Sequence, residues 1–592
     1  MCTPYNAETS LPACIALTVS LFNILLLLAV LWASPARALT VEVSAPDELK
    51  ALLVQHLDSA RAARLGETFD AWEIARLQRQ SEQTAHELLA TEGYFSPQVE
   101  SAAEWVDGDW RMTCDVKPGP RTTVRTLSVN FEGAVREDAA WLRDRAERSV
   151  TLQPGMPFRQ ADWSAAKLAV LRPLLAERFP AARLAASEAR IDPAAHAADL
   201  SLSVDSGPAF FYDTPSVKGA VRYPVSIVHH LNPTRSGKPY RQQDLLDYQA
   251  ALEMSGYYAQ ATVRVVPDPA RAAAVPIEVE VIERPARVFS VGAGASTDTG
   301  ARVQAGWQHR NLAGQGLRLK LDARLETARQ SGAAELAWPR NAKGYENSLG
   351  AHLRHEDIEG QETRSWLVAA RRKRVDGPID VSLSLQYQTE TQEVGNVVRA
   401  RNQALTATYA WTKRSVGRTF YPRRGYVLTL QGGGAVESLL SDTTFARLYV
   451  RHTQYFRAGD NGRLVLRGEW GSVLADTRDG IPTDFLFRAG GDNSVRGYAY
   501  QSLGRTLAGG VASVRHLATG SVEYNHFFGG DWGVAVFVDA GDAADTPGAL
   551  SPVFGYGVGA RYRSPVGPIN LDLAYGEATD EFRLHFSLGV SF

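Results

Sequence analysis

The last twelve residues, 581–592, alternate between two kinds of side chain. Leu584, Phe586, Leu588, Val590 and Phe592 are apolar, and Arg583, His585, Ser587, Gly589 and Ser591 stand between them. A period of two places the two sets on opposite faces of a β-strand. A strand that ends on an aromatic residue is typical of bacterial outer-membrane barrels, whose last strand pairs with the first. We therefore expect a barrel-closing strand with its apolar set toward lipid and its other set toward a hydrated lumen.

Composition narrows the class of protein further. The chain has 592 residues and a formal net charge of −2, which argues against nucleic acid as the main partner. A mean hydropathy of −0.20 does not exclude a membrane protein, because barrel strands are apolar on one face only. No run of 18 or more apolar residues follows residue 34, so no membrane-spanning helix is expected in the mature chain.

The N-terminus has the pattern of a secretion signal. Residues 14–33 are apolar, and a small-residue Ala-Arg-Ala pattern ends at Ala38, so residues 1–38 are predicted to be a signal peptide. No Lys or Arg precedes the apolar run, whose 20 residues would also span a bilayer. An uncleaved N-terminal anchor therefore remains the alternative. Without the signal, Cys114 is the single cysteine and has no partner for an internal disulfide.

The region that follows repeats itself. Residues 155–162 (GMPFRQAD) and 237–244 (GKPYRQQD) agree at most positions, and each opens a helical pattern followed by a β-rich run. A fainter copy begins at residues 66–70. Such self-similarity predicts a tandem array of small domains. Each copy has the order β-α-α-β-β, which packs two helices on a three-stranded sheet. We predict three α+β domains with the bounds 39–120, 121–208 and 209–285.

Residues 286–592 are rich in glycine and aromatic residues and alternate in polarity. A spanning strand takes about 9–11 residues plus its turn, so the 307 residues of this region predict a 16-stranded antiparallel transmembrane β-barrel. In the final hairpins one parity is apolar, whereas the other includes Asp539, Arg561, Arg563 and Asp572. A soluble barrel would show the reverse, so the lumen is expected to be wet.

A long connection within this region carries the sharpest local motif. Residues 487–498 read FRAGGDNSVRGY and end in Val495, Arg496, Gly497 and Tyr498. Its glycines and asparagine supply turn geometry. The segment is therefore predicted to be a loop, and its arginine could reach the lumen.

The loop arginine has three predicted partners. Asp539 and Phe537 share one strand face, and Glu523 lies on the strand before them. A guanidinium offers a planar fork of donors suited to carboxylates, so Arg496 is expected to pair with both acids.

No catalytic group, cofactor or metal site is predicted. The chain has no Gly-x-Ser-x-Gly pattern, and His352 and His355 would point to opposite faces of a strand. We therefore expect a protein that is not an enzyme.

These motifs together resemble one family. Residues 495–498 look like the sixth-loop signature of the BamA/TamA superfamily, and residues 537–541 resemble its partner strand motif. The tandem repeats resemble POTRA (polypeptide-transport-associated) domains. The resemblance implies a barrel in the outer membrane of a Gram-negative bacterium, in contact with its lipid, and POTRA domains in the periplasm.

The number of modules refines what this resemblance implies. Three modules are similar to the TamA branch of the superfamily. That branch implies insertion of other barrel proteins, notably autotransporters, together with a TamB-like inner-membrane partner. Insertion would use a lateral seam between the first and last strands, and Gly589 would weaken the last one. Two alternatives remain: a two-partner secretion transporter that exports one cognate protein, and a component of envelope lipid transport.

Overall fold

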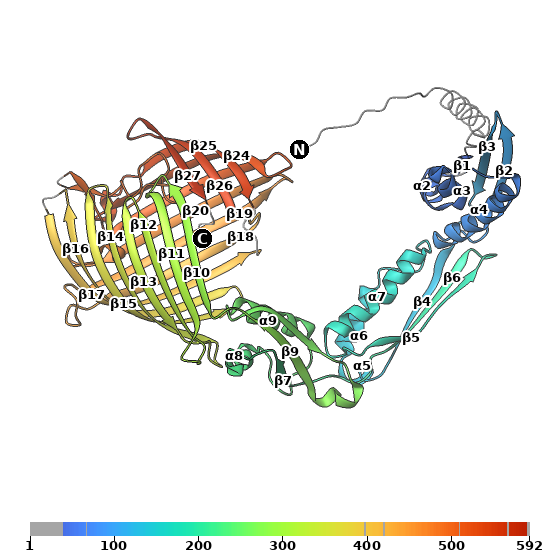
Figure 1. Cartoon of the computed structure of the whole chain (residues 1–592), viewed down its shortest axis with the longest axis horizontal. Coiled ribbons are helices and arrows are strands. Elements are labelled where there is room, and N and C mark those ends of the chain that lie inside the picture. Colours follow the sequence, from blue (N-terminus) through green and yellow to red (C-terminus); the bar gives the residue numbers. More distant parts are fainter. Residues whose placement is uncertain are drawn as a thin grey trace, which may run out of the picture. The chain divides into compact units, whose positions relative to one another are not determined.

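A computed structural model describes residues 39–66, 68–395, 398–417, 421–507, 509–564 and 567–588. Within them, three small α/β units precede a 16-stranded antiparallel sheet, which confirms the predicted fold class (Figure 1). The predicted signal peptide and Gly589, Val590 and Phe592 of the last strand lie outside the described residues. No helix within the described part of the chain is both long and apolar enough to cross a bilayer.

The first module, like the second, has one more helix than the sequence pattern predicted. It consists of β1 (Leu39–Ser44), α2 (Asp47–His56), α3 (Asp58–Leu65), α4 (Ala71–Thr91), β2 (Gln98–Val106) and β3 (Asp109–Lys117). The extra boundary lies at Leu57, whose ψ of 137° interrupts the helical path. Strand β3 is central, parallel to β1 and antiparallel to β2. Helix α4 starts with a capping box, in which the side chains of Asp70 and Glu73 each accept the other's backbone N–H at 2.8 Å.

The second and third modules repeat this sheet order. The second consists of β4 (Thr123–Glu132), α5 (Val135–Asp138), α6 (Ala140–Ser149), α7 (Gln160–Ala176), β5 (Arg183–Asp192) and β6 (Ala197–Asp205). The third consists of β7 (Tyr212–Lys218), α8 (Val225–Leu231), α9 (Gln242–Met254), β8 (Tyr258–Val265) and β9 (Val275–Glu283). In each sheet the last strand of the module lies in the middle. The domain bounds at 120, 208 and 285 stay predictions.

The sixteen strands of the large sheet follow one another in chain order. They are β10 (Arg287–Ser296), β11 (Gly300–Leu312), β12 (Leu317–Glu326), β13 (Arg329–Ala337), β14 (Tyr345–Ile358), β15 (Gln361–Asp376), β16 (Ile379–Val394), β17 (Val398–Val416), β18 (Gly425–Ala435), β19 (Phe445–Ala458), β20 (Gly462–Leu474), β23 (His516–Phe527), β24 (Trp532–Ala544), β25 (Val553–Ser564), β26 (Gly567–Gly576) and β27 (Glu581–Leu588). Strands β10 and β27 are the two ends of the sheet and lie beside each other (Figure 1).

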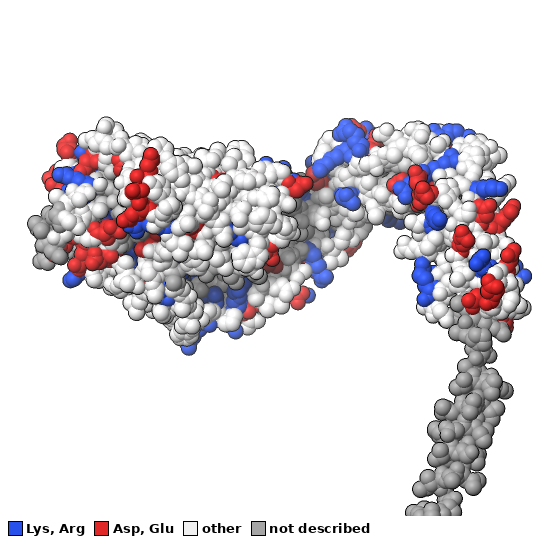
Figure 2. Space-filling view, turned by 90° about the horizontal axis from the view of Figure 1, so that it is seen from above, with Lys and Arg blue, Asp and Glu red and all other residues white. Residues whose placement is uncertain are grey.

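Polarity alternates across the wall of this barrel. On β24, Val536 and Val538 are exposed, whereas Phe537 and Asp539 are buried. On β27 the Leu584 side chain is 56% exposed and His585 only 5%. The wall that Figure 2 shows is mostly free of charged residues, which gather toward its rims. The outward face therefore suits lipid.

At one end of the barrel, two residues of the third module contact the β11–β12 hairpin. The hydroxyl of Tyr257, which precedes β8, donates to the carbonyl oxygen of Gly316 in the β11–β12 turn at 2.6 Å. In the same region, Asn311 Nδ2 donates to the carbonyl oxygen of Arg222 at 2.8 Å. We call this the module end, and the opposite end, which holds the β10–β11 turn, the far end.

Candidate functional site

Residues 475–515, here called the lumen loop, connect β20 to β23, and their described part lies against the inner face of the barrel. Three short elements shape the loop: η2 (Thr483–Phe485), β21 (Arg505–Leu507) and β22 (Gly510–Ala512). Val495, Arg496, Gly497 and Tyr498 are all buried. The sequence motif is therefore buried between the loop and the wall.

Arg496 meets all three residues that the sequence proposed as its partners. Its Nη1 lies 2.6 Å from Glu523 Oε2, and its Nε lies 2.7 Å from Asp539 Oδ2. The Phe537 ring lies under the guanidinium, with 3.3 Å from Cζ to the ring centroid. A fourth partner, Asp572 on β26, lies 3.1 Å from Nη1. The sequence showed that Asp572 faces the lumen but not that it reaches this arginine.

A second arginine completes the charge cluster. Arg561 on β25 pairs with Glu523 at 3.2 Å and also with Asp572. Two guanidinium groups and three carboxylates thus share one sheltered region, and Asp539 is fully buried. Buried charges persist only when they are paired and hydrogen-bonded. Removal of either arginine would leave carboxylates without compensation.

Small residues on β25 provide the space for this cluster. A Cβ on Gly555 would lie 1.9 Å from the Arg496 carbonyl oxygen, and one on Gly557 would lie 2.1 Å from Phe537 Cζ. A Cβ on Gly559 would lie 1.8 Å from Asp572 Oδ1. The absence of a side chain at these three positions therefore leaves room for the Arg496 backbone, the Phe537 ring and the Asp572 carboxylate.

Tyr498 and Gly497 hold the loop to the final strands. The Tyr498 hydroxyl donates to the Phe554 carbonyl oxygen at 3.0 Å and accepts the N–H of Ala578 at 2.9 Å. Gly497 has a φ of 96°, and a Cβ there would lie 2.9 Å from the backbone N of Gly576. Only glycine suits this close approach.

The expectation of a wet lumen holds for only part of the interior. A polar cavity of about 320 Å³ beside the loop is lined by groups such as Arg463 and Arg467. Elsewhere the loop residues Phe485 and Phe487 pack with Phe445 and Val473 of the wall in an apolar cluster. The loop buries apolar side chains of its own, which the strand alternation could not reveal.

The two edge strands make little direct contact through their described residues. Strand β27 pairs with β26 from Glu581 to Leu588. Between the described parts of β27 and β10 no backbone ladder is formed. The backbone N–H of Phe586 donates instead to Thr297 Oγ1 at 3.3 Å. We call this boundary the seam. Leu584 faces outward as predicted, and the side chain of Leu588 lies outside the described residues.

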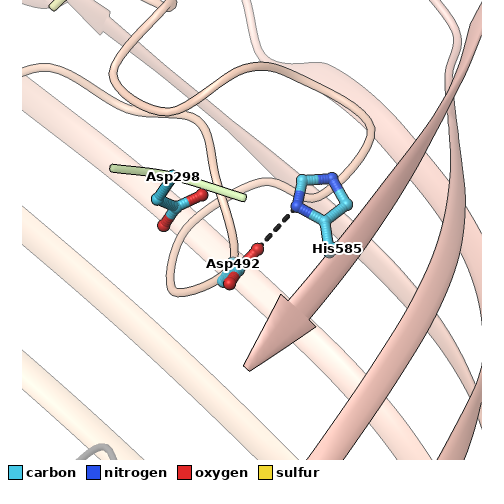
Figure 3. Close-up of side chains that lie close together, drawn as sticks. All are labelled: Asp298, Asp492 and His585. Carbon is cyan, nitrogen blue, oxygen red and sulfur yellow. Dashed lines mark hydrogen bonds and ion pairs between the residues drawn. The ribbon is translucent and has the colours of Figure 1, made fainter. Parts of the chain in front are cut away.

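Three further side chains meet at the far end of the seam (Figure 3). Asp298 lies in the β10–β11 turn, Asp492 in the lumen loop and His585 on β27. His585 Nδ1 lies 2.6 Å from Asp492 Oδ1. Burial and the charge of Asp492 raise the pKa of Asp298 to about 6. Sequence reasoning missed this cluster because its members come from distant segments without a shared motif.

The residue types in this cluster could ligate a metal ion, since their ligand atoms lie within 4.8 Å of one another. The hydrogen bonds oppose that use. Gly497 N–H donates to His585 Nε2 at 3.0 Å, so the ring proton belongs on Nδ1, where it faces Asp492. Neither ring nitrogen then offers a free lone pair to a cation.

Comparison with known proteins identifies the family to which this barrel belongs. The Omp85 superfamily domain matches residues 288–592, just over half of the chain. The chain belongs to the Omp85 superfamily. The match covers the barrel, the lumen loop and both edges of the seam.

Two similar proteins show the extent of the similarity. Outer envelope protein 80 of Arabidopsis thaliana chloroplasts is 26% identical over 62% of this chain and 54% of its own length. Outer membrane protein assembly factor BamA of Nitratidesulfovibrio vulgaris is 25% identical over 58% of this chain and 46% of its own. The chain thus spans about half the length of these relatives.

A solved BamA structure shares the fold. BamA from Haemophilus ducreyi lacking POTRA domains 1–3 superposes with a TM-score of 0.62 at 16% identity. The match covers 79% of this chain and all of that one. The barrel accordingly lies in the outer membrane, with the small modules as periplasmic POTRA domains. The module end is periplasmic, and the far end faces the outside.

Proposed function

We propose that this Omp85 protein assembles other β-barrel proteins in the outer membrane, by admitting their strands through the seam between β10 and β27. The observation that carries the proposal is the seam itself. Every other neighbouring pair in the sheet shares a ladder. The described part of β27 is instead joined to the β10–β11 turn by a hydrogen bond from the Phe586 N–H to Thr297 Oγ1.

An edge strand is a template for another strand. Its outward N–H and C=O groups are unpaired, and an incoming extended segment can satisfy them by β-augmentation. In the hydrocarbon region this matters more, because no water is present to satisfy the groups. A client strand that pairs with an opened edge is therefore stabilised by its own hydrogen bonds, and no covalent chemistry is required.

The lumen loop would keep the C-terminal wall rigid during this exchange. Arg496 ties the loop to β23, β24 and β26 through Glu523, Asp539 and Asp572. We call the β10 side and the β27 side of the seam its two lips. Because the loop braces the β27 lip, the β10 lip can move while the β27 lip keeps its shape. The finer assignment is a TamA-like assembly factor that acts on autotransporters with a TamB-like partner. It is supported by the three modules.

A cross-link across the seam tests the proposal. Thr297→Cys and Phe586→Cys replace the two residues of the hydrogen bond across the seam. They can be joined by a short bismaleimide in a background in which Cys2, Cys14 and Cys114 are replaced by alanine. The matched control joins Ala293→Cys to Val303→Cys, which pair directly within one hairpin. The seam cross-link is expected to deplete several barrel proteins from the outer membrane, as measured by proteomics, and the control is not.

The same experiment separates the alternatives. Loss of one secreted protein, with barrel proteins unchanged, would instead indicate two-partner secretion. Altered lipid asymmetry with unchanged barrel proteins would indicate lipid transport. Affinity capture of the full chain from envelopes tests for an inner-membrane partner and for autotransporters among the clients.

A further inference from the structure

The lumen loop reaches both lips of the seam through two adjacent residues, Gly491 and Asp492. We propose that Asp298, Asp492 and His585 form a clasp that closes the extracellular end of the seam, with His585 as the positioning residue. The proposal rests on the lateral seam proposed above and assigns its regulation. The clasp is closed by hydrogen bonds and poised to open by the repulsion of two carboxylates.

His585 fixes the loop to the last strand at two points. Its Nδ1–H donates to the Asp492 carboxylate at 2.6 Å, and its Nε2 accepts the Gly497 N–H at 3.0 Å. The exposed fractions of the His585 and Asp492 side chains are 5% and 11%. Sheltered hydrogen bonds to a charged acceptor are among the stronger ones in proteins. These two hydrogen bonds therefore hold the loop to β27.

The contact with the opposite lip is weaker. The backbone N–H of Asp492 donates to the Asp298 carboxylate, which the Asp492 carboxylate simultaneously repels. Gly491 has a φ of 93°, and a Cβ there would lie 3.2 Å from Asp298 Oδ1 and 2.9 Å from Tyr500 Cδ2. The loop backbone thus fits closely against the turn, and its hydrogen bond to Asp298 is opposed by the like charge of Asp492.

This asymmetry determines where the clasp opens. The loop is held to its own lip by His585 and by the Arg496 cluster, whereas Asp298 is held by one hydrogen bond opposed by a like charge. The seam should therefore part between Asp298 and Asp492, with loss of the Phe586–Thr297 hydrogen bond, and the loop should stay with β27. A client would meet β10 as the freed edge.

Spin labels measure this opening without any client present. Ala293→Cys on β10 and Leu584→Cys on β27 report the distance between the lips in the full-length protein in vesicles. A pair at Val538→Cys and Leu584→Cys reports within one lip. His585→Leu removes both hydrogen bonds of the ring and is expected to raise the open population about tenfold. His585→Gln retains a donor and an acceptor and should restore most of the closed population.

Substitutions at Asp298 test whether repulsion between the Asp298 and Asp492 carboxylates favours opening of the clasp. Asp298→Asn keeps the acceptor for the Asp492 N–H and removes the repulsion, so it should lower the open population. Asp298→Ala removes the acceptor and should raise it. Asn570→Ala is the matched control, because it removes the 3.1 Å hydrogen bond from Asn570 Nδ2 to Ser587 Oγ on β27 without touching the clasp. It should leave the distance between the lips unchanged.

Two results would overturn the clasp. One is an equal open population in His585→Leu and Asn570→Ala. The other is closure of the wild type by added Mn²⁺ or Zn²⁺ that Asp298→Asn abolishes, since that would make the cluster a metal bridge. A working clasp in a protein whose seam cross-link leaves barrel assembly unchanged would instead count against the proposed function alone.

Discussion

Arg496 and Asp539 form a two-point ion pair inside the barrel. Arg496 Nε donates to Asp539 Oδ2 at 2.7 Å, and Nη2 donates to Oδ1 at 2.9 Å. The backbone N–H of Arg496 also donates to Oδ2, at 3.0 Å. The same carboxylate therefore orients both the side chain and the backbone of the loop, which couples the loop's path to strand β24.

Substitution of this arginine should destabilise the barrel. Arg496→Ala leaves buried carboxylates with one arginine between them, and the expected loss is about 3–5 kcal/mol. Urea unfolding in micelles, followed by heat-modifiable gel mobility, measures it. Arg505→Ala in the same loop breaks an exposed pair with Asp545 and should cost no more than about 1 kcal/mol. Equal losses in the two variants would contradict the bracing role.

The glycine stripe on β25 should be intolerant of alanine. A Cβ on Gly557 would overlap Phe537 and would also lie 2.6 Å from the Leu573 carbonyl oxygen. Gly557→Ala should therefore displace the loop and expose it to trypsin. Gly468→Ala on β20 is the control, because a Cβ there meets nothing within 4 Å. Identical digestion patterns for the two variants would contradict the inference that these glycines make room for the lumen loop.

Two neighbouring tyrosines should respond in opposite ways to loss of a hydroxyl. Tyr257→Phe leaves the Gly316 carbonyl without its 2.6 Å donor, at an expected cost of about 1–3 kcal/mol. Among the described residues, the buried Tyr258 hydroxyl has no hydrogen-bond partner. Tyr258→Phe should therefore be neutral or stabilising in the same unfolding assay. A larger loss for Tyr258→Phe would contradict the assignment of these contacts.

The cysteine of the first module should be inert in the native protein. Burial, with smaller effects of Glu82 and Asp115, raises the pKa of Cys114 from 9.0 to about 11. Those two pKa units lower the thiolate fraction at pH 8 about 100-fold. Because the native state holds the proton more tightly, this group lowers stability only as the pH rises above 9. Maleimide labelling at pH 8 should require urea, and rapid native labelling would contradict the burial.

The helical part of the chain shows where local sequence signals suffice. Asp70 and Glu73 mark the start of α4 with a capping pattern, and Gly66 ends α3 in a left-handed conformation. The break at Leu57 carries no glycine or proline. Leu57 is completely buried, so packing of α2 and α3 on the sheet, and not a local breaker, separates these two helices.

The charge cluster shows what alternation can and cannot provide. Strand parity assigned Asp539 and Asp572 to the lumen face, because side-chain direction has a period of two. Strand parity could not predict that Asp572 contacts the two arginines, since that contact depends on the register in which Gly559 lies opposite Asp572. Register between strands is set by packing and turns across the whole sheet.

By itself the sequence determined which face of each final strand meets lipid, and that three small modules precede the barrel, because polarity periods and repeats are local properties. Only the tertiary structure brought Asp298, Asp492 and His585 together. Their contact depends on closing the sheet so that its first hairpin meets its last strand. Ring closure is a global event, and the entropy of bringing distant segments together is offset only by the assembled wall.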